Sequence, residues 1–118
     1  MKIIATIITH NRLDLLKRCI NFINEQSLKP DEIFVVNNSS TDNTESYLKE
    51  NKINHITQKN LGSAYGWYTA IEYSIKNYFD YVWLMDDDGF PDKVALEKLS
   101  KMMKKSQNQA CISSIVVD

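Results

Sequence analysis

An apolar run leads directly into three aspartates in the stretch Tyr81-Val82-Trp83-Leu84-Met85-Asp86-Asp87-Asp88-Gly89. A short apolar run that ends in polar residues and a glycine predicts a strand, here one that is buried on both faces. Side chains alternate along an extended segment, so Asp86 and Asp88 are expected to face one side and Asp87 the other. The stretch therefore predicts a buried strand that presents carboxylates at its carboxyl end.

The residues on either side of this stretch repeat the same plan. Apolar runs predict further strands at residues 3–8, 32–36, 53–57 and 110–117. Amphipathic stretches predict helices at residues 12–26, 42–51, 64–77 and 91–105. This alternation favours a single α/β domain over residues 1–118, with a mostly parallel sheet and helices on both faces.

Capping residues indicate where the helices begin. Asn11 can cap the first helix, with Asp14 three residues further on. Asp42 and Glu45 have the spacing of a capping box for the second helix. Pro91 suits the first turn of the last helix, because its missing N–H is not needed there.

The composition is that of an ordinary soluble globular protein. Of the 118 residues, 43% are hydrophobic and 25% are charged, which is enough for one apolar core. The net charge of -1 gives no general attraction for nucleic acid, and no apolar stretch approaches the ~20 residues of a membrane span. Cys19 and Cys111 are predicted to be buried free thiols, which suits a reducing cytoplasm. Six aromatic residues are expected to lie mostly in the core: Trp67, Tyr68, Tyr73, Tyr78, Phe79 and Trp83.

Four polar segments follow the predicted strands, and they are the least periodic parts of the chain. They are Thr9-His10-Asn11-Arg12, Asn37-Asn38-Ser39-Ser40, Asn60-Leu61-Gly62 and Asp86-Asp87-Asp88. In open parallel sheets, ligands bind beyond the carboxyl ends of the strands. We therefore expect these four segments to form one binding rim.

The acidic triplet has the chemistry of a divalent-cation site. Three adjacent carboxylates repel one another, and a bound cation removes that conflict. Mg²⁺ or Mn²⁺ prefers hard oxygen ligands, commonly one or two carboxylates together with substrate phosphates. Asp86 and Asp88 are the predicted metal-facing pair, and Asp87 is expected to contact hydroxyls of a bound ligand or backbone amides. The alternative is a solvated acidic loop that caps the next helix.

The other rim residues each allow two interpretations. Arg12 is either a solvated helix residue or a partner for a diphosphate. Asn37 and Asn38 either form an Asx-rich turn or bond to the edge of a nucleobase. The glycines within residues 60–66 fit neither the dinucleotide-binding pattern nor a P-loop. They indicate either a tight loop or a close approach of the backbone to a ribose or phosphate.

Taken together, these residues resemble the family-2 glycosyltransferases with the GT-A fold. Four motifs match in order along nearly the whole chain: Ile8-Thr9-His10-Asn11-Arg12, Val35-Val36-Asn37-Asn38-Ser39-Ser40-Thr41-Asp42, Asn60-Leu61-Gly62 and Trp83-Leu84-Met85-Asp86-Asp87-Asp88. Each motif alone is weak, and the resemblance depends on their order and spacing. The last motif is most similar to the branch that contains galactofuranosyl- and rhamnosyltransferases.

The resemblance implies the N-terminal, nucleotide-sugar-binding part of an inverting glycosyltransferase. Such an enzyme would move a rhamnosyl or galactofuranosyl unit from a UDP- or dTDP-sugar to a glycan or lipid-linked acceptor. The implied donor contacts are Thr9, Asn11, Arg12, Asn37, Asn38, Asn60, Gly62 and Asp87, with Mg²⁺ or Mn²⁺ on Asp86 and Asp88. The expected setting is a bacterial cell-envelope pathway in the cytoplasm, with the inner face of the membrane as an alternative location.

Two departures from the family pattern matter. Asn37 stands where the family commonly has an aspartate; its amide oxygen can still accept a bond from a base N–H but adds no charge. The sequence also stops at Asp118, so the acceptor-binding region and the general base are expected beyond it. Two alternatives stay open: a donor-binding module without turnover, and a nucleotidyltransferase, although the glycine-rich loop of the latter is absent after the first strand.

Overall fold

The computed structural model describes residues 1–106 and 110–115, in which four strands alternate with four helices. In chain order they are β1 (Ile3–Thr9), α1 (Leu13–Asn24), β2 (Glu32–Asn38), α2 (Thr44–Glu50), β3 (Asn54–Gln58), α3 (Ser63–Lys76), β4 (Tyr81–Asp86) and α4 (Ala95–Lys105). All strand pairs are parallel, and the strand order is β3-β2-β1-β4. The predicted α/β fold with a parallel sheet is therefore confirmed.

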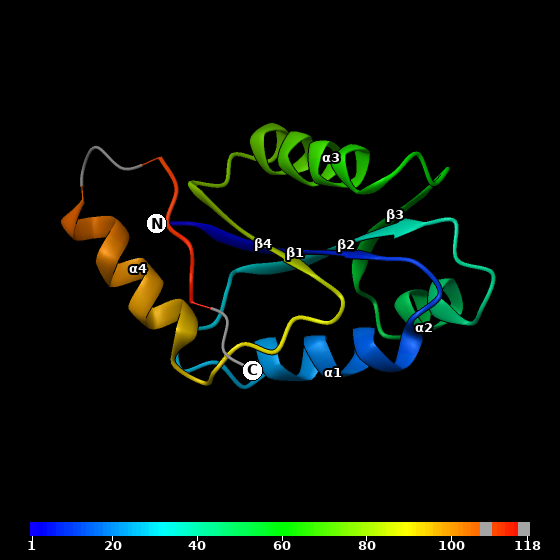
Figure 1. Ribbon diagram of the computed structural model, residues 1–118, viewed down its shortest axis with the longest axis horizontal. Coiled ribbons are helices and arrows are strands. Elements are labelled where there is room, and N and C mark those ends of the chain that lie inside the picture. The colour runs from blue at the N-terminus through cyan, green and yellow to red at the C-terminus, as the bar shows by residue number, and fades with distance from the viewer. Residues whose placement is uncertain (107–109, 116–118) are drawn as a thin grey trace.

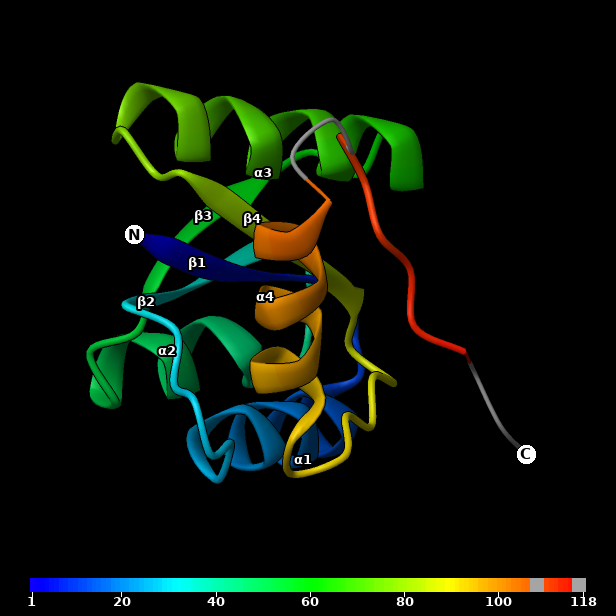
Figure 2. The same ribbon diagram turned by 90° about the vertical axis from the view of Figure 1, so that its left-hand side faces the viewer.

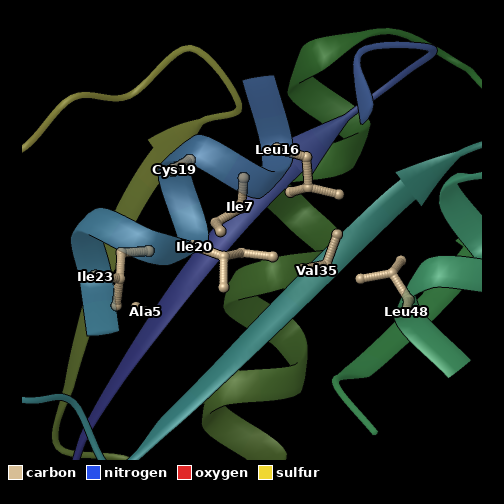
Figure 3. Close-up of a cluster of buried hydrophobic side chains, with 8 residues drawn as sticks. All are labelled: Ala5, Ile7, Leu16, Cys19, Ile20, Ile23, Val35 and Leu48. Atoms are coloured by element: carbon tan, nitrogen blue, oxygen red, sulfur yellow. The ribbon is translucent and has the colours of Figure 1, made fainter. Parts of the chain in front are cut away.

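Helices cover both faces of the sheet, as predicted (Figure 1). α3 lies on one face, where its Ala70 packs in a cluster with Ile4, Ile8, Phe34 and Val36. α1 and α2 lie on the opposite face over a second cluster (Figure 3), which contains Ala5, Ile7, Leu16, Cys19, Ile20, Ile23, Val35 and Leu48. α4 stands at the end of the sheet where β1 begins (Figure 2). The end where the strands finish is therefore free of α4.

The apolar spacing of the sequence explains which residues are buried. β1 is an interior strand, and all seven of its residues are buried because helices cover both of its faces. α1 buries Leu16, Cys19, Ile20 and Ile23. Their i, i+3, i+4, i+7 spacing places them on one face of the helix. Within residues 1–106 and 110–115, the structure contains no helix with the length and apolar character needed to cross a bilayer.

The last two predicted strands differ from the structure. Among the residues that the structure describes, β4 lies at the edge of the sheet and pairs with β1 alone. The prediction of burial on both faces is therefore wrong; Leu84, for example, is 41% exposed. The predicted strand at 110–117 is also wrong over residues 110–115, which form no strand, while positions 116 and 117 lie outside the described residues. Apolar character does not distinguish an edge strand from a central one, and a run becomes a strand only when a neighbour accepts its backbone bonds.

The helices begin later than the capping signals predict. Asn11 does not cap α1, which starts at Leu13. The capping box of α2 is incomplete: Asp42 Oδ1 accepts a bond from the amide of Thr44 at 3.1 Å, but the carboxylate of Glu45 accepts a bond from Thr57 on β3 instead of returning to the helix start. α4 starts at Ala95, four residues beyond Pro91. In the first two cases, the side chain that local spacing predicts as a cap forms a hydrogen bond with a residue elsewhere in the fold.

Some predictions of burial are wrong. Cys19 is buried, but Cys111 is exposed. Tyr68 on α3 and Tyr78, two residues beyond the end of α3, are 59% and 86% exposed. The other four aromatic residues pack against the two core clusters as predicted: Trp67, Tyr73, Phe79 and Trp83.

The two thiols are expected to differ in reactivity. Burial, and second the nearby Asp87 carboxylate, raises the pKa of Cys19 to about 12, so its reactive thiolate is scarce at neutral pH. We expect only Cys111 to react with an aromatic disulfide reagent in the native protein, and both thiols to react in guanidinium. Cys111→Ser should therefore remove the native reaction. Rapid labelling of that variant would contradict the burial of Cys19.

Candidate functional site

Parallel pairing brings the four polar segments to one edge of the sheet. In register, Thr9 on β1 lies opposite Asn37 on β2, and Ile8 lies opposite Asp86 on β4. Asn38 pairs in the same way with Gln58 at the end of β3, just before the loop that leads to α3. This edge is the carboxyl end of every strand and lies away from α4 (Figure 1). The structure therefore gathers the segments from which the sequence predicts a rim.

The acidic triplet forms a tight turn at the end of β4. The amide of Asp87 donates to the carbonyl oxygen of Ile8 at 3.2 Å, and the amide of Gly89 donates to the carbonyl oxygen of Asp86 at 2.9 Å. A Cβ at position 89 would lie 2.9 Å from the same Asp86 oxygen, so any larger residue would shift the backbone. Asp86 and Asp88 are exposed while Asp87 is buried, as the alternation of side chains predicts.

Asp87 is held inside the protein by two side chains, one at the end of β1 and one in the loop just after it. Thr9 Oγ1 donates to Asp87 Oδ2 at 2.9 Å, and Arg12 Nη1 lies 3.3 Å from Asp87 Oδ1. Asp87 is only 4% exposed, whereas the Arg12 side chain is 55% exposed. A buried carboxylate is tolerated when its charge and its lone pairs find partners. Its predicted contact with a bound ligand stays a prediction.

The two exposed aspartates have the electrostatics of a cation site. Partial burial, followed by the charges of Asp88 and Asp87, raises the pKa of Asp86, and Arg12 opposes this shift. A divalent cation would relieve the repulsion. Across residues 1–106 and 110–115, no three His, Cys, Asp or Glu side chains are grouped as a cage for a metal. The pair therefore fits a cation that takes its other ligands from water and phosphate oxygens, which is the usual arrangement for Mg²⁺.

Asn11 ties the loop after β1 to the loop after β2. Its Oδ1 accepts a bond from the backbone amide of Thr41 at 2.6 Å, and its backbone amide donates to Ser40 Oγ at 3.0 Å. Beside it, His10 Nδ1 lies 2.5 Å from the carbonyl oxygen of Asn38. Asn11 has a φ of 51°, a left-handed conformation that asparagine adopts more readily than most residues. The side chain supports the rim, and its predicted contact with a donor is untested.

Asn37 and Asn38, at the end of β2, face the protein interior. Asn37 is fully buried; its Nδ2 donates to Thr57 Oγ1 at 3.3 Å, and its Oδ1 accepts from the amide of Ser40 at 3.3 Å. Asn38 Oδ1 accepts from Gln58 Nε2 at 3.1 Å. Both amides therefore shape the loop, which agrees with the turn interpretation. The predicted contact with a base edge stays a prediction.

The loop before α3 places Asn60 and Gly62 at the exposed surface of the rim. Gly62 has a φ of 99°, which residues with a side chain rarely adopt, and its amide donates to Asn60 Oδ1 at 3.1 Å. One turn into α3, a Cβ at Gly66 would lie 3.0 Å from Ile8 Cγ2. Gly66 therefore allows α3 to pack closely on β1, as the tight-packing interpretation of these glycines expects.

No local sequence pattern indicates the residues that support the acidic turn from α1. Cys19 Sγ lies 3.5 Å from Met85 Sδ, although the two residues are 66 positions apart. After the turn, the ring of Phe90 meets that of Phe22 edge-on at 4.7 Å between centroids and lies 4.0 Å from the guanidinium carbon of Arg18. The turn is therefore anchored on both of its sides, through contacts that only the folded chain creates.

Asn11→Ala is expected to loosen the rim. The change removes the acceptor for Thr41 and places alanine at a positive φ, so we expect the free energy of unfolding to fall by about 1–3 kcal/mol. Asn11→Gly loses the same side-chain bond but tolerates the backbone conformation, so it should be the less destabilised of the two. Urea denaturation of both variants measures the difference. A glycine variant as unstable as the alanine variant would contradict the role given to the backbone.

The fold and the rim together define a Rossmann-like α/β domain with an acidic turn at the carboxyl edge of its sheet. The chain belongs to glycosyl transferase family 2, because the sequence model of that family matches residues 5–118. It is 29% identical over 90 residues to galactofuranosyltransferase GlfT1 of Mycolicibacterium smegmatis, and 30% identical over 92 residues to GlfT1 of Mycobacterium tuberculosis. Each match covers 74% of this chain and 30% of the relative, so the chain spans under a third of the length of these relatives.

Solved glycosyltransferase structures share the fold. Mannosyltransferase PcManGT from Pyrobaculum calidifontis, in complex with GDP-Man and Mn²⁺, matches with a TM-score of 0.72 and 22% identity over 86% of this chain and 32% of that chain. S. aureus TarS 1-349, in complex with UDP-GlcNAc, matches with a TM-score of 0.72 and 21% identity over 91% of this chain and 32% of that chain. The predicted GT-A fold is therefore confirmed.

Proposed function

We propose that this chain is the donor-binding part of a metal-dependent glycosyltransferase, which moves a sugar from a nucleoside diphosphate to a hydroxyl of a glycan or lipid-linked acceptor. The observation that carries the proposal is the exposed pair Asp86 and Asp88 at the carboxyl edge of the sheet, on an anchored turn beside Arg12. Family membership supports it, and so do the nucleotide sugars named for PcManGT and TarS.

The proposed chemistry follows from the leaving group. Negative charge grows on the diphosphate as its bond to the sugar breaks, and a cation at Asp86 and Asp88 would offset that charge where it develops. Arg12 lies at the same edge with most of its guanidinium side chain in solvent, so its remaining N–H groups can bond to diphosphate oxygens. Attack by the acceptor on the opposite face of the sugar would invert the anomeric carbon. The acceptor hydroxyl loses its proton to a general base, which we assign to no residue of this chain.

Among donors, we propose a UDP- or dTDP-linked galactofuranose or rhamnose. The similarity to the GlfT1 proteins supports a furanosyl donor. We also propose that the base edge is recognised at the end of β2, where Asn37 and Asn38 would exchange their present protein partners for the base. We place the protein in the cytoplasm, at or near the inner face of the membrane, a compartment that its free thiols suit.

Isothermal titration calorimetry with UDP, dTDP and GDP tests the proposal. Each nucleotide is titrated into the chain with Mn²⁺ and then with EDTA. We expect UDP or dTDP to bind only when Mn²⁺ is present, and GDP to bind more weakly than either. Binding that is the same in EDTA, or no binding of any nucleotide by folded protein, would contradict the proposal.

The alternative function is donor binding without turnover, because no general base is assigned among the residues of this chain. Release of UDP from a UDP-sugar separates the two functions. An active transferase domain should release UDP slowly to water and faster when an acceptor is added, whereas a binding module should release none.

A further inference from the structure

We infer that Asp87 is a positioning residue, held in the interior by Thr9 and Arg12, which fixes the turn that carries Asp86 and Asp88. The inference rests on the proposed function, because it takes the two exposed aspartates as ligands of the cation. It assigns Thr9 and Asp87 a contact with each other in place of the donor contacts that the sequence predicts for them.

Neither residue has a polar atom left to offer at the surface. Asp87 is 4% exposed, and each of its carboxylate oxygens already has a protein donor within 3.3 Å. Thr9 is 2% exposed, and its hydroxyl has one proton, which it gives to Asp87. A ligand could bond to these groups only after the edge of the sheet opened. The buried pair is therefore built to be used within the protein.

The backbone of Asp87 is anchored at the same place as its side chain. Its amide donates to the carbonyl oxygen of Ile8 at 3.2 Å, a bond that belongs to the last pair of the β1–β4 ladder, Ile8 with Asp86. The side chain then bonds to Thr9, the next residue of β1. With both its backbone and its side chain fixed, Asp87 cannot rotate. Its two neighbours, Asp86 at the end of β4 and Asp88 in the turn, are both exposed.

Arg12 links this interior contact to the rim. Within residues 1–106 and 110–115, Arg12 is the positively charged side chain that forms an ion pair with Asp87. The pair uses one guanidinium nitrogen and one carboxylate oxygen at 3.3 Å, so it is not bidentate. The other N–H groups belong to a side chain that is 55% exposed. Arg12 can therefore balance the buried charge of Asp87 while still offering donors to a diphosphate.

Two matched substitutions at Thr9 separate positioning from packing. Thr9→Val keeps the volume of a buried β-branched side chain but removes the hydroxyl that holds Asp87. Thr9→Ser keeps the hydroxyl but removes a buried methyl group. If the bond to Asp87 positions the turn, the valine variant should bind the cation more weakly than the serine variant. If Thr9 serves packing alone, the order should be reversed or absent.

The test uses Mn²⁺ alone as the probe, titrated into the 118-residue chain and followed by electron paramagnetic resonance. We expect Asp88→Asn to weaken binding by at least about 100-fold, because it removes a ligand, and Asp87→Asn and Thr9→Val to weaken it by about 10-fold each. Thr9→Ser should stay within about threefold of wild type. The double variant Thr9→Val/Asp87→Asn should bind no more weakly than the weaker single variant, because both changes break the same contact.

Water-proton relaxation on bound Mn²⁺ then counts the ligands. Asp88→Asn should gain a coordinated water, and Asp87→Asn should keep the number found in wild type. If Asp87→Asn gains a water or binds as weakly as Asp88→Asn, Asp87 is itself a ligand and the inference is overturned. Thr9→Val binding as tightly as Thr9→Ser would overturn it as well, and this comparison remains available if Asp87→Asn does not fold.

Addition of UDP to the same samples separates this inference from the proposed function. If wild type binds Mn²⁺ with the expected pattern of variants but does not bind UDP, the proposed function fails and the positioning role stands. If UDP binding depends on Mn²⁺ but the Thr9 variants do not differ, the proposed function stands and the positioning role fails. A wild-type chain that binds neither Mn²⁺ nor UDP would overturn both.

Discussion

Asp88→Asn should abolish metal-dependent nucleotide binding, with a loss of at least about 100-fold in affinity. Changes to residues that only support a metal ligand already cost about 10–100-fold in affinity, so loss of a ligand itself should cost at least as much. The side chain is exposed on the acidic turn, so the substitution should leave the fold intact. Calorimetry of UDP binding with Mn²⁺ measures the loss, and circular dichroism checks the fold.

Asp14→Asn is the matched control for this substitution. Asp14 is also an exposed aspartate, and it lies in the first turn of α1, close in sequence to the rim. The Asp14→Asn substitution removes the same charge as Asp88→Asn, so an effect of net charge alone would appear in both variants. We expect Asp14→Asn to bind the nucleotide within about twofold of wild type. Similar losses in the two variants would contradict a specific cation site on the acidic turn.

Ile23→Ala should be the most destabilising of the single substitutions considered for this chain. Ile23 on α1 is fully buried in the core cluster against the sheet, as Figure 3 shows. Truncation of a buried isoleucine leaves a cavity and costs about 2–5 kcal/mol of unfolding free energy. Urea or thermal denaturation measures this loss, which for a small domain is a large part of its stability.

Ile75→Ala is the control, because it is the same substitution at the same place in a helix. Ile75 on α3 is the residue before the last, as Ile23 is on α1, but it is 68% exposed. Truncation of this exposed side chain leaves no cavity, and alanine is the better helix former. We therefore expect the free energy of unfolding to change by under about 0.5 kcal/mol. Comparable destabilisation in the two variants would contradict the core described for the α1 face of the sheet.

Local sequence patterns predict the plan of this fold well because the sheet is parallel and its two central strands, β1 and β2, are interior. Interior parallel strands are apolar on both faces, so β1 and β2 stand out against the amphipathic helices between them. The pattern fails at the edges. β4 and the segment that begins at residue 110 are both predicted as strands, yet β4 forms a half-exposed edge strand and residues 110–115 form no strand. The difference depends on which neighbours are present, and a single segment does not encode that.

The candidate site is predictable in outline for a similar reason. The carboxyl ends of parallel strands must meet at one edge, and alternation along an extended segment already separates Asp87 from Asp86 and Asp88. The partner of each side chain is not predictable. Thr9 and Asp87 bond across 78 positions of sequence, and no spacing signals such a contact. For the same reason Asn11 is predicted as a helix cap, whereas its side chain bonds to the loop after β2.

We propose that a cation bound to Asp86 and Asp88 joins the protein to a nucleoside diphosphate. A crystal of the chain grown with UDP and Mn²⁺, measured at the manganese absorption edge, tests it most directly. We expect one anomalous peak at bonding distance from carboxylate oxygens of Asp86 and Asp88, with the diphosphate completing the coordination and Asp87 still bonded to Thr9. UDP bound with no manganese peak at the acidic turn, or a peak bonded to Asp87, would contradict it.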